Sequence, residues 1–439
     1  MKYTNTKERI EISQLENLFR FGEKKKQDFK TGIEYERIPI NIKNGHNTQY
    51  YDCCGILNLL NKIAHNENWQ YITDTTNGNV LGLRKLEDTI TLEPGCQIEL
   101  SIKPENKISK LEEKINNLDS MFEKYMRENG VQLLNCGISP LSTQNNIHLL
   151  PKSRYHLMAR YMWGILSDVM MRETAGIQCC IDFESEEDMS EKFKTANRLT
   201  PFMTAMFANS PIRGGVETGY KSFRALSWLY TDNERCGFAY DFNRDFTYKK
   251  YIEKVLNVPM IFITRGCENI KINGRINFKE FIQNGFSTFD ATIEDFKLHA
   301  NLYFPEVRLR EFIEIRNHDC VSKNLMFAIP AIYKGILYKK SARDDINNLL
   351  KKFKAEDFED LRYSVPKMAL EAPIGRYKAC DISKEIIKIA EKSLIENKEG
   401  EEKYLANLKK LTFNNLCPAD VVLKNFKGDV RKILFENLV

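Results

Sequence analysis

Several stretches of the chain alternate apolar and polar residues with a period of two, which predicts β-strands. These stretches are residues 31–40, 96–102, 177–183 and 306–316. Between them, apolar residues recur every three or four positions, as on one face of a helix. The helical patterns lie near residues 8–26, 53–66, 108–125, 157–172, 187–208, 292–301, 324–338, 345–354 and 382–397. Together these patterns are typical of an antiparallel sheet with one face packed on helices.

Two of the helical patterns are long enough to interpret further. Residues 157–172 carry an apolar stripe that we expect to face the core. Residues 108–125 alternate apolar steps of three and four, as a coiled coil does, but the pattern lasts for fewer than three heptads. We therefore interpret residues 108–125 as a surface helix docked on the domain.

The polar faces of the predicted strands carry carboxylates. Glu34 and Glu36 point to the same side of their strand, because side chains alternate between the two faces. Glu99 lies on the polar face of the next strand, and Glu93 precedes the turn at Pro94 and Gly95. The same parity places Gln178 and Asp182 on one face of residues 177–183, and Glu314 and Arg316 on one face of residues 306–316.

A solvent-exposed sheet face would produce such alternation without any function, but its polar residues would normally be Lys, Ser and Thr. Here four distant strands carry acids together with Gln or Arg. Hard cations such as Mg²⁺ take oxygen ligands and commonly work through a few carboxylates plus substrate phosphates. Arginines on the same face would hold carboxylate or phosphate oxygens. An acidic sheet face therefore favours a site for Mg²⁺ and phosphates.

Composition and charge narrow the class of protein. The 439 residues include 65 Lys and Arg against 60 Asp and Glu, a net charge of +5, with 42% hydrophobic residues. This balance argues against a disordered chain and against a nucleic-acid binder. No apolar run reaches the length of about 20 residues that a membrane span needs, and the charged N-terminus lacks the apolar region of an export signal. We expect a cytoplasmic protein with free thiols, organised as one domain over residues 1–439.

Other motifs carry less weight. Residues 214–222 resemble a phosphate-binding loop, but Tyr220 separates the last glycine from Lys221 and no buried strand precedes it. The six histidines show no metal-ligand spacing. Spacing alone leaves a cysteine nucleophile open at Cys180, although a structural thiol is favoured.

A series of landmarks, in a fixed order, then suggests a family. They are residues 32–36, residues 91–101, Gln178 with Asp182 and Phe183, residues 208–211, Trp228 with Thr231, Asp232 and Arg235, and residues 304–309 with Glu314 and Arg316. In these landmarks the chain resembles the glutamate–cysteine ligases of the plant and proteobacterial type, within the carboxylate–amine ligases related to glutamine synthetase.

The resemblance implies an α+β fold with a curved, mainly antiparallel sheet, a concave active-site face and helices on the outside. It implies an enzyme that uses ATP and Mg²⁺ to join the γ-carboxylate of L-glutamate to the amine of L-cysteine, the first step of glutathione synthesis. The reaction passes through a γ-glutamyl phosphate and gives γ-glutamylcysteine, ADP and phosphate. The partners are then small molecules, with no nucleic acid and no membrane, and the protein is expected to be a monomer or homodimer.

The resemblance also implies roles for individual residues. Metal ligands would be Glu34, Glu36, Glu93, Glu99 and Glu314. Residues at the reaction would be Glu34, Glu36, Arg235 and Arg316, with Arg316, Arg235 and Glu314 at ATP. The substrate would contact Gln178, Arg224, Trp228 and Asp182.

The chain departs from the family pattern at two positions. Cys96 stands in place of a Gly, and Cys180 in place of an Asn. Two alternatives therefore stay open: a sister ligase that joins glutamate to another amine, and a non-catalytic homologue that binds a nucleotide or an amino acid.

Overall fold

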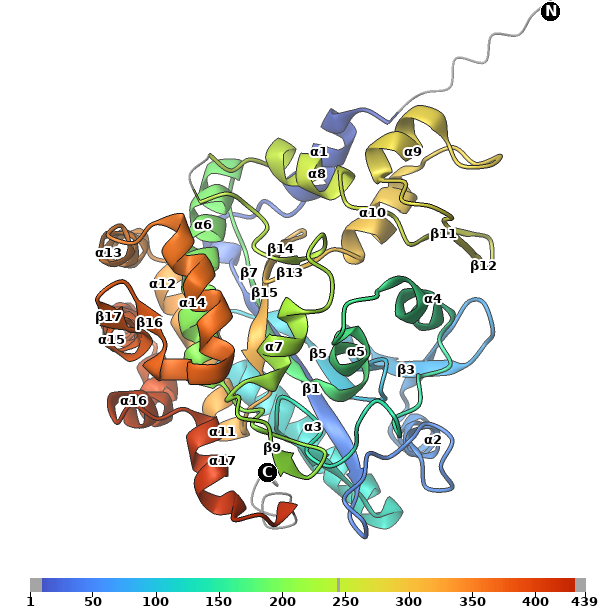
Figure 1. The fold of residues 1–439 in the computed structure, drawn as a ribbon, viewed down its shortest axis with the longest axis horizontal. Coiled ribbons are helices and arrows are strands. Elements are labelled where there is room, and N and C mark those ends of the chain that lie inside the picture. The colour runs from blue at the N-terminus through green and yellow to red at the C-terminus, as the bar shows by residue number, and fades with distance from the viewer. Residues whose placement is uncertain (1–9, 243–244, 431–439) are drawn as a thin grey trace, which may run out of the picture.

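The protein is described here by a computed structural model covering residues 10–242 and 245–430. Its centre is a nine-stranded sheet in the order β14-β15-β7-β1-β5-β4-β3-β2, with β6 paired to β1 (Figure 1). All strand pairs in this sheet are antiparallel. The strands are β1 (Thr31–Asn41), β2 (Gln70–Thr73), β3 (Val80–Lys85), β4 (Asp88–Leu92), β5 (Ile98–Glu105), β6 (Val131–Leu134), β7 (Gly176–Ile181), β14 (Val307–Leu309) and β15 (Ile313–Asp319).

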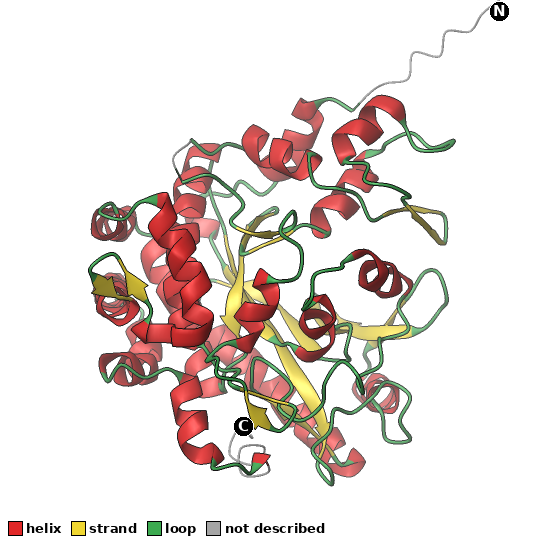
Figure 2. Cartoon of the chain, viewed as in Figure 1, coloured by secondary structure: helices red, strands yellow, loops and turns green. Residues whose placement is uncertain are grey.

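Helices surround the sheet (Figure 2). They are α1 (Ile12–Arg20), α2 (Ile56–Glu67), α3 (Ile108–Asn129), α4 (Ser153–Tyr161), α5 (Ser167–Glu173), α6 (Glu186–Phe207), α7 (Phe223–Leu229), α8 (Tyr248–Leu256), α9 (Phe278–Asn284), α10 (Ile293–Asn301), α11 (Lys323–Met326), α12 (Ala328–Leu337), α13 (Lys340–Leu350), α14 (Ala355–Met368), α15 (Ala379–Asn397), α16 (Ala406–Phe413) and α17 (Pro418–Phe426).

Four small two-stranded sheets lie outside the central sheet. They are β8 (Ile212–Arg213) with β9 (Val216–Glu217), β10 (Cys236–Gly237) with β13 (Phe304–Pro305), β11 (Phe262–Arg265) with β12 (Glu268–Lys271), and β16 (Pro373–Ile374) with β17 (Tyr377–Lys378). Of these, β10 and β13 are parallel. The predicted α+β fold with a mainly antiparallel sheet is confirmed.

The two faces of the sheet differ as the alternation of β1 requires. Ile33 and Tyr35 are buried, and Arg37 on the same face pairs with Asp119 of α3 at 2.6 Å. Helices α3 and α12 pack on this face, and α6 packs against β14 and β15. The opposite face carries Glu34, so its carboxylate points away from the helices of the core.

The apolar stripe of α3 is buried along its whole length, which confirms a docked helix. Residues 157–172 are not one helix, however. The chain leaves α4 at Tyr161 and re-enters a helix at Ser167, and Ile165 of the predicted stripe is 83% exposed. The break lies where Gly164 meets the carbonyl oxygen of Thr231 so closely that a Cβ would stand 2.1 Å from it. Docking on this second segment therefore overrides the helical pattern.

Residues 306–316 form a hairpin instead of one continuous strand. The turn falls between β14 and β15, and Arg308 pairs with Glu314 across the ladder. Cross-strand partners share a face, so the parity expected from the sequence survives the turn.

None of the described helices is long and apolar enough to span a membrane. Most of the N-terminal segment behind the expectation of no export lies outside the described residues.

Candidate active site

Strand pairing brings carboxylates from separate parts of the chain together. Glu36 on β1 stands directly opposite Glu99 on β5, and Glu34 stands opposite Gln178 on β7. Gln178 donates from Nε2 to Glu36 at 3.0 Å and accepts from Arg316 at 2.6 Å. The register thus joins three strands through one polar network on the sheet face.

A cavity of about 290 Å³ lies over this face, between the sheet and helices α4, α5 and α7. Of the predicted site residues, it is lined by Glu34, Glu36, Glu93, Glu99, Gln178, Arg224, Trp228 and Arg316. Helix α4 adds Arg154 and Tyr155, and the β14 hairpin adds Arg308 and Arg310. Eight of the eleven predicted residues therefore meet in one cavity.

Burial and neighbouring negative charges raise the pKa values of the carboxylates on the sheet face. Loss of solvent and then the charge of Glu314 raise the pKa of Glu34 from 4.5 to about 7. Loss of solvent also raises the pKa of Glu36, with a further rise from Glu93, and the pKa of Glu99 lies well above its ordinary value. Buried acids that repel each other are held for a purpose other than stability.

The donor set fits a divalent cation. Four carboxylates line the cavity, and three of them carry raised pKa values that a bound cation would lower. In the two described stretches, no three His, Cys, Asp or Glu side chains are arranged as a metal-binding group. Mg²⁺ usually binds through one or two carboxylates and completes its shell with water and phosphate, so it needs no such group.

Glu93 reaches the cavity from the turn before β5. The hydroxyl of Tyr155 lies 3.4 Å from a carboxylate oxygen of Glu93, and the turn is closed by the Gly95 amide, which donates to Gln97. Cys96 occupies this turn with a φ of 67° and is buried. The backbone there still adopts the conformation that glycine favours.

Glu314 organises arginines and is absent from the cavity lining. Its side chain is fully buried and accepts from Arg308 at 2.6 Å, from Arg316 at 3.1 Å and from Arg310 at 3.3 Å. Burial alone would raise the pKa of Glu314, but these guanidinium groups, Arg308 foremost, hold it well below its ordinary value. The role of Glu314 as a metal ligand or ATP contact stays a prediction, and in the structure its oxygens accept from three arginines.

Arg224 and Trp228 reach the cavity from α7, whose N-terminus is capped by Ser222. The hydroxyl of Ser222 also donates to Asp319 at the end of β15, at 2.9 Å. Arg224 donates to the carbonyl oxygen of Arg316 at 3.0 Å. A Cβ on Gly176 would stand only 2.3 Å from the guanidinium of Arg224. The glycine at the start of β7 thus leaves the space that Arg224 occupies.

Two predicted residues lie outside the cavity. Asp182 follows β7 and accepts from Lys24 at 2.7 Å and from the Lys30 amide at 2.8 Å. Arg235 has no exposed surface and donates to Asp232 and to the carbonyl oxygen of Leu302. Both side chains bind neighbouring loops in the structure, and their expected roles at the substrate and at ATP stay predictions.

The sequence interpretation missed further residues that line the cavity. Arg308 and Arg310 share the parity of Glu314, so the strand pattern already held a signal for them. Arg154 and Tyr155 lie at the start of α4, and nothing in the pattern sets them apart from surface residues. The Nε atom of Arg154 is buried and finds no hydrogen-bond partner in the described parts of the chain.

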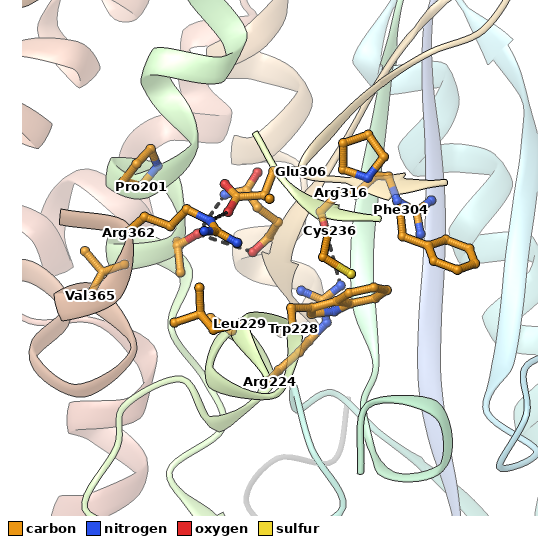
Figure 3. Close-up of a pocket in the computed structure, with 15 residues that line it drawn as sticks. Pro201, Arg224, Trp228, Leu229, Cys236, Phe304, Glu306, Arg316, Arg362 and Val365 are labelled. Carbon is orange, nitrogen blue, oxygen red and sulfur yellow. Dashed lines mark hydrogen bonds and ion pairs between the residues drawn. The ribbon is translucent and has the colours of Figure 1, made fainter. Parts of the chain in front are cut away.

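A smaller chamber of about 40 Å³ adjoins the cavity (Figure 3). The two spaces share four lining residues, which are Arg224, Trp228, Phe304 and Arg316. The rings of Trp228 and Phe304 lie 6.2 Å apart and form part of the wall between them.

Solved structures share this fold. The glutamate–cysteine ligase of Francisella tularensis, solved in complex with AMP, superposes with a TM-score of 0.57 at 14% identity, covering 93% of this chain and 87% of that one. A bifunctional glutathione synthetase from Pasteurella multocida gives a TM-score of 0.52 at 12% identity, covering 97% of this chain and 52% of that one. At these identities the likeness is one of fold.

Sequence relatives lie among plant enzymes. Glutamate–cysteine ligase B from Oryza sativa subsp. japonica is 30% identical over 412 residues, covering 92% of this chain and 82% of the relative. The glutamate–cysteine ligase from Arabidopsis thaliana is 29% identical over 414 residues, covering 93% of this chain and 78% of the relative. Both relatives are named as chloroplastic, and this finding overturns the expectation of a cytoplasmic protein. The composition argument addressed export alone and held no information on organelles.

The match to a family model agrees with these relatives. The model of glutamate–cysteine ligase family 2 covers residues 30–434, and so includes every strand of the central sheet and every residue that lines the cavity. The chain therefore belongs to glutamate–cysteine ligase family 2.

Proposed function

We propose that this protein joins the γ-carboxylate of L-glutamate to the amine of L-cysteine at the expense of ATP, giving γ-glutamylcysteine. The observation that carries the proposal is the cavity over the sheet, where Glu34, Glu36, Glu93 and Glu99 line the same space as Arg154, Arg308, Arg310 and Arg316. A ligase that brings ATP beside a carboxylate needs both kinds of group, because the reactants crowd negative charge together.

The chemistry requires no nucleophile from the protein. The γ-phosphoryl group of ATP passes to an oxygen of the glutamate γ-carboxylate, which yields ADP and an acyl phosphate. The uncharged cysteine amine then attacks the acyl carbon. The C–N bond forms, the C–O bond to phosphate breaks, and the nitrogen loses a proton to water or a carboxylate.

The acidic residues have a defined role in this proposal. Glu34, Glu36, Glu93 and Glu99 would hold Mg²⁺, which supplies positive charge to the phosphates when it is bound. Without that charge, the same carboxylates would repel ATP. Their concentration on one sheet face supports the assignment, since nothing in the fold needs repelling acids there.

The basic and polar residues would bind the reactants. Arg308, Arg310 and Arg316 are fixed by Glu314, so they can meet the transferring phosphoryl group without reordering. Gln178 stands between Glu36 and Arg316, which suits a residue that orients the γ-carboxylate. Arg224 and Trp228 would contact the amino acid from α7.

Phosphate release tests the function. Purified protein with ATP, Mg²⁺ and L-glutamate should release phosphate rapidly only when L-cysteine is added, and mass spectrometry should detect γ-glutamylcysteine. Faster release with another amine would refute the acceptor and identify a sister ligase. Tight nucleotide binding without release for any amine would refute catalysis.

We also propose that residues 1–439 form a single catalytic domain. One contiguous cluster of buried apolar residues extends from Leu15 to Val430, which supports this organisation. Whether the protein is a monomer or a homodimer stays a prediction.

A further inference from the structure

Two cysteines that the proposed reaction does not use are adjacent in the chain and exposed at the surface. Of the eleven cysteines, seven are buried, and the exposed ones are Cys53, Cys54 and Cys267. Free cysteine is among the residue types most often buried, so two consecutive exposed thiols are unusual. Cys53 and Cys54 lie in the turn that leads into α2, at the lower right of Figure 1. Neither lines the main cavity or the chamber beside it.

Hydrogen bonds fix the backbone of this turn. The amide of Gln49 donates to Oδ2 of Asp52 at 2.8 Å, and the amide of Gly55 donates to the carbonyl oxygen of Asp52, also at 2.8 Å. Ile56, the first residue of α2, donates to the carbonyl oxygen of Gln49 at 3.1 Å. The turn therefore presents both thiols on an ordered backbone, which lowers the entropy cost of binding a ligand between them.

The spacing of the two thiols disfavours a disulfide between them. Consecutive Cα atoms are about 3.8 Å apart. Disulfides usually join Cα atoms that are about 4.4–6.8 Å apart, and outside this range they are strained and easily reduced. A bridging ion instead leaves about 3–4 Å between the two sulfur atoms, because a bond from a metal to a thiolate is about 2.3 Å long. The pair is therefore better suited to hold an ion than to form a disulfide.

The number of available ligands selects the kind of ion. Within residues 10–242 and 245–430, no three His, Cys, Asp or Glu side chains are grouped as a metal site, so the two thiols have no third ligand of this kind. Structural zinc takes four protein ligands, and Mg²⁺ and Ca²⁺ take oxygen. Thiolates instead select soft centres such as Cu(I). A trivalent arsenical with one organic substituent is likewise satisfied by two thiolates.

We propose that Cys53 and Cys54 form a site for a soft, thiophilic centre that needs two protein ligands. With phenylarsine oxide as the ligand, the two S–H bonds and the As=O bond break and two As–S bonds form. The oxygen leaves as water with the two thiol protons. Arsenic stays trivalent, so the step consumes no oxidant or reductant. The site lies outside the cavity over the sheet, and its occupation does not depend on ligase activity.

Titration with phenylarsine oxide tests the site. In protein kept reduced by a phosphine, mass spectrometry should find one phenylarsenic group per chain, on the tryptic peptide of residues 44–62, which contains both cysteines and no others. Cys53→Ser and Cys54→Ser should each weaken binding about 100-fold or more, because the second thiolate of a chelate binds at a high effective concentration. Cys267→Ser is the matched control, since it removes an exposed thiol without an adjacent cysteine, and it should leave the affinity unchanged.

The other outcomes of this titration would overturn the proposal. Both side chains are exposed and serine is close to cysteine in size, so each variant should keep the circular dichroism spectrum and the Tm of the unaltered protein. Equal affinity in the unaltered protein and in Cys53→Ser or Cys54→Ser would show that other thiols bind the arsenical. Absence of arsenic from the peptide of residues 44–62 at one equivalent would also refute the site. A peptide that is two hydrogens lighter before any treatment would reveal a disulfide and refute the argument from Cα spacing.

Discussion

Replacing Glu34 with Gln should make the protein more stable and less active. Glu34 lies in a cavity with Glu36, Glu93 and Glu99, and loss of solvent with the charge of Glu314 raises its pKa from 4.5 to about 7. At roughly 1.4 kcal/mol for each tenfold change in proton affinity, this rise corresponds to about 3 kcal/mol. Ionised Glu34 therefore lowers the free energy of unfolding, and the fold retains it for the function of the site.

The cost depends on pH in a definite direction. The folded protein holds the proton of Glu34 more tightly than the unfolded chain, so the penalty is absent below pH 4.5 and complete above about pH 7. The gain in stability of Glu34→Gln over the unaltered protein should therefore be near zero at pH 4.5 and rise to about 3 kcal/mol at pH 8.

Urea denaturation in EDTA, followed by circular dichroism at pH 5 and pH 8, measures this difference. Adding Mg²⁺ at pH 8 should stabilise the unaltered protein more than the variant, since the cation relieves the repulsion. Glu123→Gln, at an exposed position of α3, should change the free energy of unfolding by less than about 0.5 kcal/mol. A Glu34→Gln protein that is no more stable than the unaltered one at pH 8 refutes the electrostatic reasoning; full ligase activity in it refutes the metal assignment.

Three further substitutions probe the rest of the site. Glu314→Gln leaves three buried or half-buried arginines without their carboxylate and should lower the free energy of unfolding by about 3–5 kcal/mol. The loss should be visible as a large fall in Tm, and an unchanged Tm contradicts the conclusion that Glu314 holds the three arginines in place. Arg154→Gln should reduce kcat/KM by about 100-fold and leave the circular dichroism spectrum unchanged. Arg160→Gln on the same helix should leave kcat/KM unchanged. A rise in the KM for ATP or in the KM for glutamate then tells which of these anions Arg154 binds. Gly95→Ala places a Cβ 2.1 Å from the carbonyl oxygen of Arg172 and should cost about 2–4 kcal/mol of stability by chemical denaturation; a normal denaturation curve would show that this turn can shift freely.

The local elements were predictable because their signals are local. The period of two in residues 31–40 gives a strand, and its parity places Glu34 and Glu36 on one face whatever the rest of the chain does. The apolar stripe of residues 108–125 likewise gives the docked helix α3. The pattern failed at residues 157–172, where contact with Thr231 breaks the helix, because periodicity carries no information on distant segments.

The identities of the acidic residues at the site were also readable from the sequence, but their roles were not. Glu34 and Glu314 both carry a carboxylate on the expected face of a strand. One is left to repel its neighbours, and the other is neutralised by Arg308, Arg310 and Arg316. That difference arises from which side chains are brought within about 3 Å in space.

The sequence by itself determined the class of fold, the strands that carry the site and the face on which their carboxylates lie, because these follow from side-chain alternation along a single strand. Only the tertiary structure decided that Asp182 and Arg235 hold loops, that Arg154 reaches the cavity from α4, and that a chamber opens behind Trp228. The physical reason is that charge, solvent exclusion and unpaired hydrogen bonds depend on neighbours far apart in the chain, and folding alone brings those neighbours into contact.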